Sequence, residues 1–512
     1  MRTTPSVHSL ALAAAGLLSI LAGCNLAPKY ARPSAPAPAN FKEAVLPPVA
    51  WKPASPRDTV PPGRWWEIYQ DPQLNALEQQ VNISNQTILA AAANFREARA
   101  EVRAARSVLF PTVTTAPSFT RVRSSATWNP ASGAPSAGSA SSTSTSSKTS
   151  GSISNEYVLP FDVSYVIDLW HRLGNALAIS SLNAQVSAAD LAAAQLSTQA
   201  ELAQDYFELR TLDSERQILD DTVASYRQAL QATSALYHNG IDSDEDVARA
   251  QAQLDATIAQ ATDIGVSRTA REHAIAVLIG KAPADFSLPV SPLVAQPPSV
   301  PAGLPSDLLE RRPDIAAAER RVAAANAQIG IARSAYFPTL TLGVTGGWES
   351  THLAEWFDWP SRFWSVGSEL AGTVLDGGTR RAQTEEARAA FDETVANYRQ
   401  TVLEAFQAVE DNLAALRILD EESREQRTAV ESARHLLNLA TTRYQAGIDS
   451  SLNVITAQTA LLSSREAEVQ IQLRQMTSSV SLVMALGGGW DDSQLPPMPG
   501  LAAYRNKPNQ KN

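Results

Sequence analysis

Apolar side chains recur every seventh residue along two long stretches of the chain, one in each half. No proline occurs between Phe161 and Pro283, or between Ser361 and Pro496. The recurring position holds Val395, Val402, Val409, Leu416, Val430, Leu437 and Tyr444 in the second half, and Ala188, Leu202, Leu209, Val223, Leu230 and Tyr237 in the first. A heptad pattern sustained over about eight repeats is typical of coiled-coil packing. It predicts two helices of about 65 residues, each roughly 100 Å long at 1.5 Å per residue.

Each long helix is expected to turn at a glycine, Gly240 or Gly447, and to return only about half of that distance, to Gly280 or Gly487. Another helix precedes the strands. It opens at Asp71-Pro72, with a carboxylate at the N-cap and proline at the first helical position, and is predicted to run to about Ser107. Because this helix matches the return helix in length, we expect the two to stack end to end.

Strict alternation of apolar and polar residues predicts two strands in each half. The longest run alternates from Tyr157 to Leu169, and its other face carries Asp162, Ser164 and Asp168. In the second half Leu340, Leu342 and Val344 alternate with threonines, and Trp364, Val366 and Leu370 alternate with Ser365 and Glu369. Such strands have one apolar face and one wet face.

The two halves are copies of one unit. Tyr237 to Ser243 matches Tyr444 to Ser450 at an offset of 207 residues, and Phe110-Pro111-Thr112 matches Phe337-Pro338-Thr339 at an offset of 227. The difference of 20 residues falls in Ala131 to Ser154, a stretch of almost only Ser, Thr, Gly and Ala, which predicts a flexible loop. Two proline-rich connectors complete the chain, Pro28 to Pro62 and Pro289 to Pro305.

These boundaries divide the chain into six parts. We expect a signal peptide at 1–23, a proline-rich N-terminal segment at 24–62, repeat one at 63–286, a linker at 287–305, repeat two at 306–490 and a polar tail at 491–512. Four strands cannot close a transmembrane barrel, because an open edge leaves backbone groups unsatisfied in lipid. Two copies would supply eight strands and three would supply twelve, and periodicity alone does not choose between them.

The N-terminus carries a processing signal. A basic Arg2 and a short apolar stretch lead to Leu21-Ala22-Gly23-Cys24, which resembles the bacterial lipobox. That resemblance implies that Cys24 carries a covalent lipid and becomes the mature N-terminus. Asn25 at the next position implies sorting to the outer membrane.

Composition narrows the possible functions. The chain of 512 residues is 44% hydrophobic but only 6% aromatic, which favours helices packed closely through small side chains. A single cysteine excludes an intrachain disulfide, and a net charge of −10 argues against nucleic acid as a partner. The six histidines show no metal-ligand spacing, and no phosphate loop or nucleophile elbow is present. We therefore expect no enzyme activity and no cofactor other than the lipid on Cys24.

Ordered motifs across nearly the whole mature chain resemble the outer-membrane factors of bacterial tripartite efflux and type I secretion systems. The match is best with the lipoprotein branch that serves resistance-nodulation-division pumps. The motifs are Cys24 with Pro28, Tyr30 and Pro33, then Trp65-Trp66, Asp71-Pro72 with Leu74, Asp168-Leu169-Trp170, Glu310-Arg311-Arg312-Pro313-Asp314-Ile315, Ala324-Ala325-Asn326-Ala327, Ile329-Gly330, Phe337-Pro338, the two Tyr-x-x-Gly turns and Ala485-Leu486-Gly487-Gly488-Gly489-Trp490.

The resemblance implies a mainly α-helical fold with transmembrane β-strands. In it, three chains of two tandem repeats share a twelve-stranded β-barrel joined to a long coiled-coil α-barrel. It also implies a homotrimer in the outer membrane of a Gram-negative bacterium, anchored by lipid, with the helical part in the periplasm. The partners would be a periplasmic adaptor and an inner-membrane resistance-nodulation-division transporter. The helical tips at Gly240, Ile241, Gly447 and Ile448 would meet the adaptor.

The tips also carry the candidate gate. Asp242, Asp244, Glu245 and Asp246 follow the first turn and Asp449 follows the second. They are either helix N-terminal charges favoured by capping and the macrodipole, or parts of an acidic ring that binds cations and holds the periplasmic mouth closed. Asn453 and Thr456 stand where some relatives carry gating aspartates, which shifts the expected ring to Asp246 or Asp449. Tyr237 and Tyr444 either pack in the heptad seam or contact the gate.

The expected function is a passive exit duct for small toxic compounds such as drugs, with energy supplied by the inner-membrane partner. Two alternatives remain open from the sequence. One is the exit duct of a type I protein secretion system. The other is a non-conducting envelope scaffold that uses its coiled coils only for assembly.

Overall fold

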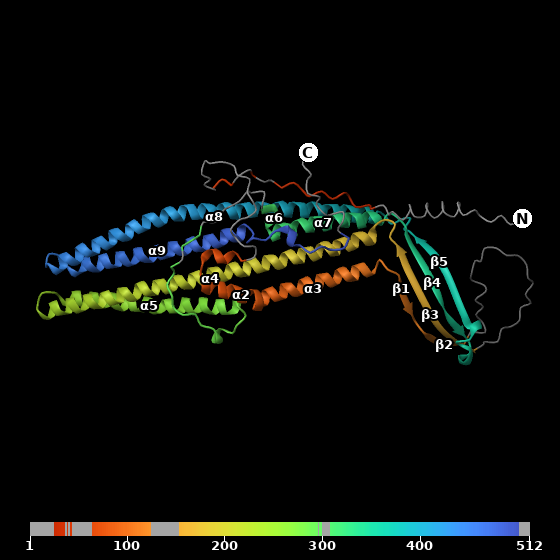
Figure 1. Ribbon diagram of the computed structural model, residues 1–512, viewed down its shortest axis with the longest axis horizontal. Helices are drawn as coiled ribbons and strands as arrows, with labels where there is room; N and C mark the ends of the chain where they lie inside the picture. Colours follow the sequence, from red (N-terminus) through yellow and green to blue (C-terminus); the bar gives the residue numbers. More distant parts are fainter. Residues whose placement is uncertain are drawn as a thin grey trace, which may run out of the picture.

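The protein is elongated, with long helices running side by side and all strands gathered at one end (Figure 1). This computed structural model describes residues 25–35, 38, 41–43, 64–123, 153–294, 296–298 and 308–500. Cys24, the predicted signal peptide and nearly all of the predicted Ser/Thr loop lie outside these residues. Within the described ranges, no helix combines the length and apolar character of a membrane span.

Two helical hairpins of equal dimensions form the body. Helices α4 (Arg172–His238) and α8 (Thr379–Gln445) have 67 residues each, and α5 (Asp244–Leu278) and α9 (Ser451–Ala485) have 35 each. The predicted lengths of the long helices and of their half-length return helices are therefore confirmed. The predicted heptad position is buried at Leu202, Leu209, Val402, Val409 and Val430, and Tyr237, at the end of the same series, is 40% exposed.

Shorter helices precede the strands in each repeat. The prediction of one continuous helix before the strands of repeat one was wrong. The helix expected from Asp71 to Ser107 is two helices, α2 (Pro72–Ser84) and α3 (Gln86–Ser107), separated by Asn85 in an extended conformation. In repeat two the equivalent pair is α6 (Leu308–Arg311) and α7 (Pro313–Ser334). The Asn85 side chain caps α3 by accepting from the Ile88 amide at 3.0 Å.

The break allows α3 alone, in place of the whole expected helix, to stack on the end of α5. The Asn85 amide donates to the Leu278 carbonyl at 2.7 Å, and the Ser84 hydroxyl donates to the Ile279 carbonyl at 2.6 Å. Gly280 then leaves the helix at φ +72°, and a Cβ there would overlap the Ser84 carbonyl. These contacts satisfy carbonyl groups that the end of a helix otherwise leaves without partners.

The same junction is built in repeat two with different chemistry. There the Arg312 guanidinium donates to the Ala485 carbonyl at 2.9 Å, and Gly487, at φ +92°, passes so close to Arg311 that a Cβ would overlap its carbonyl. Arg312 also forms a 2.6 Å ion pair with Asp314. Both repeats therefore join a half-length return helix to the helix that leads to the strands.

The strands form one antiparallel sheet in the order β1-β3-β4-β5, with β2 also paired to β3. Their bounds are β1 Thr112–Thr115, β2 Ser118–Arg123, β3 Ile153–Ile167, β4 Thr339–Ser350 and β5 Arg362–Ala371. The predicted strand through Leu169 ends two residues earlier, at Ile167. Ile153 and Ser154, predicted as loop, belong to β3.

Strands β1 and β2 are one arm in a single register along β3. Thr115 lies opposite Phe161 and Ser118 opposite Val158, so the unpaired Ala116 and Pro117 leave the register unchanged. Pro117 has no N–H to donate to a ladder, which explains the interruption. The four predicted strands are thus present, the first in two segments.

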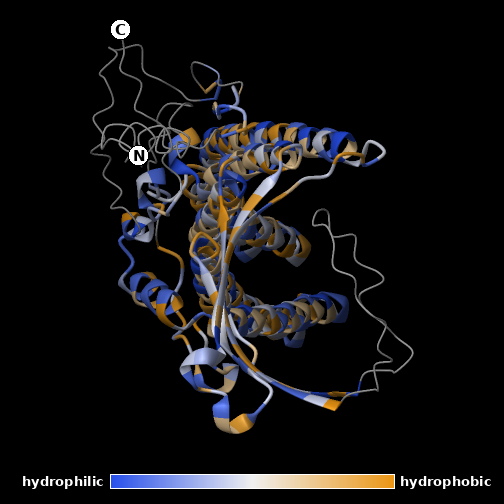
Figure 2. Ribbon diagram, turned by 90° about the vertical axis from the view of Figure 1, so that its right-hand side faces the viewer, coloured by the Kyte–Doolittle hydropathy of each residue, from blue (hydrophilic) through white to orange (hydrophobic). Residues whose placement is uncertain are grey.

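The strands meet the helices through aromatic contacts between the repeats. Trp170, just after β3, stacks on Phe337 with ring centroids 4.5 Å apart, and its indole N–H donates to the Pro338 carbonyl at 2.8 Å. Viewed along the long axis, the helices form a curved layer and the strands sweep across its end (Figure 2).

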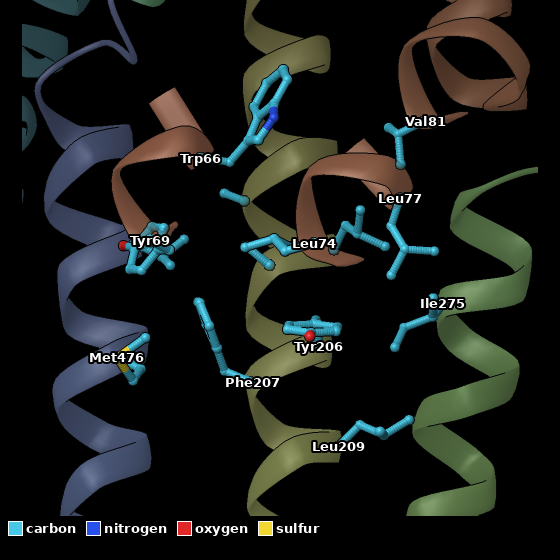
Figure 3. Packing of buried hydrophobic residues seen from close by; sticks show 14 of the residues in the cluster. Trp66, Tyr69, Leu74, Leu77, Val81, Tyr206, Phe207, Leu209, Ile275 and Met476 are labelled. Carbon is cyan, nitrogen blue, oxygen red and sulfur yellow. The ribbon is translucent and has the colours of Figure 1, made fainter. Parts of the chain in front are cut away.

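The largest hydrophobic cluster lies where α2 crosses α4, α5 and α9 (Figure 3). It includes Trp65 and Trp66 of the 3-10 turn η1 (Trp65–Tyr69), each 1% exposed, and Phe207 at 0%. The Tyr69 hydroxyl lies 2.7 Å from the Ser479 hydroxyl, so the cluster joins repeat one to the return helix of repeat two. Glu78 of α2 is also fully buried.

The N-terminal segment 25–35 runs along repeat two as an extended strap (Figure 1). The Asn175 amide donates to the Asn25 side chain at 3.2 Å, and the Asn326 amide donates to the Pro28 carbonyl at 2.9 Å. Further along, the Tyr30 hydroxyl donates to Glu319. The residue that follows Cys24 is therefore held at the start of α4, beside the base of the strands.

Candidate functional site at the helical tips

The end of the molecule opposite the strands consists of two helix turns with the same backbone geometry. Gly240 has φ +73° and Gly447 has φ +71°, conformations that favour glycine. The Ile241 amide donates to the Leu236 carbonyl at 2.9 Å, as the Ile448 amide does to the Arg443 carbonyl at 3.0 Å. Ile241 and Ile448 lie at these turns and are 70% and 69% exposed, so each tip presents an apolar side chain to solvent.

Asp246 forms hydrogen bonds both within the first tip and to the second hairpin. It forms a capping box with Ser243, the N-cap of α5, and it accepts a 2.7 Å hydrogen bond from the Ser451 hydroxyl at the start of α9. The hydroxyl of Ser243, followed by that of Ser451, lowers the pKa of the Asp246 carboxyl. Asp246 is therefore both a local cap and a contact between the two hairpins.

Tyr444 makes the second contact between the hairpins. Its hydroxyl donates to the Asp242 carboxylate at 2.7 Å and lies 3.2 Å from the Thr233 hydroxyl. Burial, together with the hydrogen bond to Asp242, raises the pKa of the Tyr444 hydroxyl. The tip of repeat two is thus bonded to the tip of repeat one by Tyr444–Asp242 and Ser451–Asp246.

Among the residues that the structure describes, Asp449 forms hydrogen bonds only within its own repeat. It accepts from the Arg443 guanidinium at 3.1 Å and from the Asn453 amide, and these bonds, with that of Asn453 foremost, lower the pKa of its carboxyl. Tyr237 is equivalent to Tyr444, yet within the described chain its hydroxyl forms no hydrogen bond and its ring lies 5.7 Å from that of His238.

The structure thus brings together three of the five predicted gate residues: Asp242, Asp246 and Tyr444. Among the described residues, Asp449 and Tyr237 form no hydrogen bond with this group. Sequence reasoning missed Ser451, Thr233 and Ser243. Only Ser243 left a readable signal, because a serine three residues before a carboxylate at a helix start is a capping box. Among the described residues, no group of three or more His, Cys, Asp or Glu side chains could hold a metal ion.

Comparison with known proteins shows which family the chain resembles. The family model described as "Outer membrane efflux protein" matches residues 77–281 and 304–488, one match for each repeat. The chain belongs to this family.

Several outer membrane efflux proteins of Pseudomonas putida are similar along almost their whole length. The toluene efflux pump outer membrane protein TtgC of this species is 31% identical over 95% of this chain and 96% of its own. The antibiotic efflux pump outer membrane protein ArpC has the same identity and coverage. Among solved structures, the outer-membrane channel OprN superposes with a TM-score of 0.81 at 28% identity, over 91% of this chain and all of that one.

A second solved structure, the outer membrane protein VceC of Vibrio cholerae, gives a TM-score of 0.76 at 26% identity over 84% of this chain and all of that one. The protein is therefore an outer-membrane channel component of an efflux system in a Gram-negative bacterium. Its fold class, expected from the family resemblance, is that of these channels.

Proposed function

We propose that three copies of this chain form a passive duct whose periplasmic mouth is held closed by hydrogen bonds between helical tips. The observation that carries the proposal is the pair of bonds Tyr444–Asp242 and Ser451–Asp246, which tie the two hairpins of one chain together at the end opposite the strands. Within the described residues the sheet has edges at β5 and at the arm formed by β1 and β2, which supports assembly into a closed ring.

The two gate residues outside this contact complete the proposal. Tyr237 and Asp449 are the repeat equivalents of Tyr444 and Asp242, and within the described residues neither is hydrogen-bonded to that pair. We place the corresponding contact between Tyr237 of one copy and Asp449 of the next. Opening would then require breaking bonds of the same kind around the whole ring.

The exposed Ile241 and Ile448 at the turns would dock a periplasmic adaptor that links the duct to an inner-membrane resistance-nodulation-division transporter. Exposed apolar side chains beside Gly240 and Gly447 suit the tips of a partner's helices. The proteins similar to this chain are named for efflux of toluene and antibiotics, so we propose small apolar toxic compounds as the cargo.

Lipid on Cys24 would fix the duct in the outer membrane. The strap holds Asn25, the next residue, against Asn175 at the base of the strands, which is where a membrane-inserted acyl chain would be needed. Incorporation of radiolabelled palmitate into the chain, and its loss in Cys24→Ala, tests this part.

Two assays together test the proposed function. The first expresses the chain with an adaptor and transporter in an efflux-deficient host and measures minimum inhibitory concentrations of toluene and antibiotics. The second records currents of the purified protein in planar bilayers. Restored resistance with measurable conductance supports the duct. Absence of current under all conditions would support a scaffold, and export of a protein substrate without drug resistance would support type I secretion.

A further inference from the structure

The two faces of the sheet carry charges of opposite sign. Residues that lie opposite each other on neighbouring strands share a face, so the strand pairing sorts every described strand residue to one face or the other. The face of Tyr157 and Phe161 is mostly apolar, and it holds all the arginines of the described strands: Arg121, Arg123 and Arg362. The opposite face holds all their acidic residues: Glu156, Asp162, Glu349 and Glu369.

The three arginines lie at the end of the sheet that is farther from the helices (Figure 1). Strand β2 runs away from the helices and ends at Arg123, and β5 begins at Arg362 and runs back toward them. Arg121 and Arg123 are two residues apart on one strand, so their Cα atoms are about 7 Å apart and their side chains leave the same face. Because the helical part lies in the periplasm, this end of the strands lies at the outer leaflet of the outer membrane.

A row of aromatic rings crosses the same face beside the arginines. Phe119 contacts Tyr157 with ring centroids 4.7 Å apart, and Tyr157 contacts Trp356 at 5.7 Å. Trp356 lies 5.0 Å from Phe357, whose ring in turn lies 6.1 Å from that of Trp348. Aromatic rings on the lipid face of membrane strands gather at the depth of the headgroups. The row therefore places the arginines at headgroup level.

The arginines have no carboxylate partner in the part of the chain that the structure describes. All three are exposed, and none forms an ion pair there, although Glu355 and Asp358 lie in the segment that leads to Arg362. The Arg362 guanidinium lies over the Trp359 ring, 3.7 Å from its centroid. A guanidinium stacked on a ring keeps its in-plane N–H groups available to another acceptor.

We infer that Arg121, Arg123 and Arg362 bind the phosphate groups of outer-leaflet lipids. A guanidinium donates two parallel N–H bonds to a phosphate, and the three positive charges match an anionic headgroup. The acyl chains of such a lipid would pack along the aromatic row and on Trp364, which is 79% exposed on the same face. The inference rests on the proposed duct, whose strands span the outer membrane, and names the lipid class that this duct selects around itself.

Native mass spectrometry of the full-length protein in neutral detergent tests the inference. The probe is bisphosphorylated lipid A, and the same lipid without its phosphates reports binding through the acyl chains alone. We expect the natural protein to bind the phosphorylated lipid at least tenfold more tightly. The triple variant Arg121→Gln, Arg123→Gln, Arg362→Gln should lose this preference, and lysine at the three positions should keep part of it because the charge is retained.

The matched control replaces three exposed arginines of the long helices by glutamine: Arg227, Arg427 and Arg434. It changes the net charge by the same amount and should leave the preference for phosphorylated lipid intact. If the triple variant at the sheet fails to fold, Arg121→Gln with Arg123→Gln decides, and it should lose most of the preference.

Three results would overturn the inference. One is equal binding of phosphorylated and dephosphorylated lipid by the natural protein. Another is an unchanged preference in the sheet variants, or an equal loss in the helix control. The third is displacement of the lipid by millimolar inorganic phosphate, which would indicate a site for free phosphate.

Planar-bilayer recordings on the same proteins separate this inference from the proposed function. Selective binding of phosphorylated lipid by a protein that never conducts would contradict the duct. Normal conductance without lipid selectivity would contradict only the lipid site.

Discussion

The side-chain amide of Asn85 donates to the main-chain carbonyl of Leu278 at 2.7 Å, and through this bond the end of one helix meets the start of another. Asn85 also caps α3, so a single residue ends α2, begins α3 and receives the end of α5. The column formed by α5 and α3 runs beside α4 over most of its length because of this junction.

Replacement of Asn85 by alanine should therefore cost about 2 kcal/mol of unfolding free energy, from the lost cap and the carbonyl left without a partner. Asn85→Asp keeps the capping oxygen but turns a carboxylate oxygen toward the Leu278 carbonyl at a buried position, so it should cost at least as much as alanine. Denaturant unfolding in detergent measures both. A clearly smaller loss in Asn85→Asp than in Asn85→Ala would show that the bond to Leu278 adds little to the cap.

Two glycines with nearly the same backbone angle should differ in tolerance to alanine. At Gly240, φ is +73° and nothing lies within 4 Å of an added Cβ, so Gly240→Ala should cost only the conformational penalty of about 1 kcal/mol. At Gly280, φ is +72° but the Cβ overlaps the Ser84 carbonyl, so overpacking adds about 2 kcal/mol more. Thermal unfolding of the two variants compares them directly, and similar losses would count against the tight junction.

Glu78 should make stability fall as pH rises. It is fully buried, neither carboxyl oxygen has a hydrogen-bond partner among the described residues, and burial raises its pKa well above the ordinary value. Below about pH 4 the group is neutral in the folded and unfolded chain alike. As pH rises further, only the unfolded chain ionises, which removes up to about 1.4 kcal/mol per pH unit until the native pKa is reached.

Glu78→Gln removes this titration. Its unfolding free energy relative to the natural protein should increase steadily between pH 5 and pH 8. Glu101→Gln, on the exposed surface of α3, controls for the loss of a negative charge. Parallel pH curves for the natural protein and Glu78→Gln would contradict the prediction.

Tyr444→Phe should weaken the closed mouth. The substitution removes the hydroxyl that donates to Asp242 and leaves the ring in place, so channels in planar bilayers should open several-fold more often. Tyr237→Phe tests the equivalent contact between copies and leaves conductance unchanged if Tyr237 only packs. Asp244→Asn, at a carboxylate outside both contacts, is the control for charge at the tip.

The double variant Asp246→Ala, Asp449→Ala should change conductance and cation preference, and unchanged values would argue against the acidic gate.

The long helices, the strands and the duplication could be predicted because each produces a periodic or repeated pattern in the sequence. Val402 and Val409 repeat at heptad spacing whatever lies across from them, and Val163 alternates with its neighbours in the same way. The break at Asn85 could not be predicted, since its cause is a carbonyl of Leu278 almost two hundred residues away. The interruption at Pro117 is local, and the proline was the signal that could have located it.

At the tips, residue types were predicted better than partners. The acidic cluster and the two tyrosines mark the site in the sequence, but the bonds from Ser451 to Asp246 and from Tyr444 to Asp242 depend on how two hairpins approach each other. The burial of Glu78 is hidden for a similar reason, because the surface that covers it comes from separate parts of the chain.

Equal hairpins constrain how such a chain can change in length. Helices α4 and α8 have 67 residues each, and α5 and α9 have 35 each, so both turns lie at the same level. A deletion of one heptad in a single hairpin would withdraw Asp242 and Asp246 from Tyr444 and Ser451 by about 10 Å. Only matched deletions in all four helices would keep the tips level. The length of the helical part can therefore change in evolution only if the same deletion or insertion occurs in both hairpins.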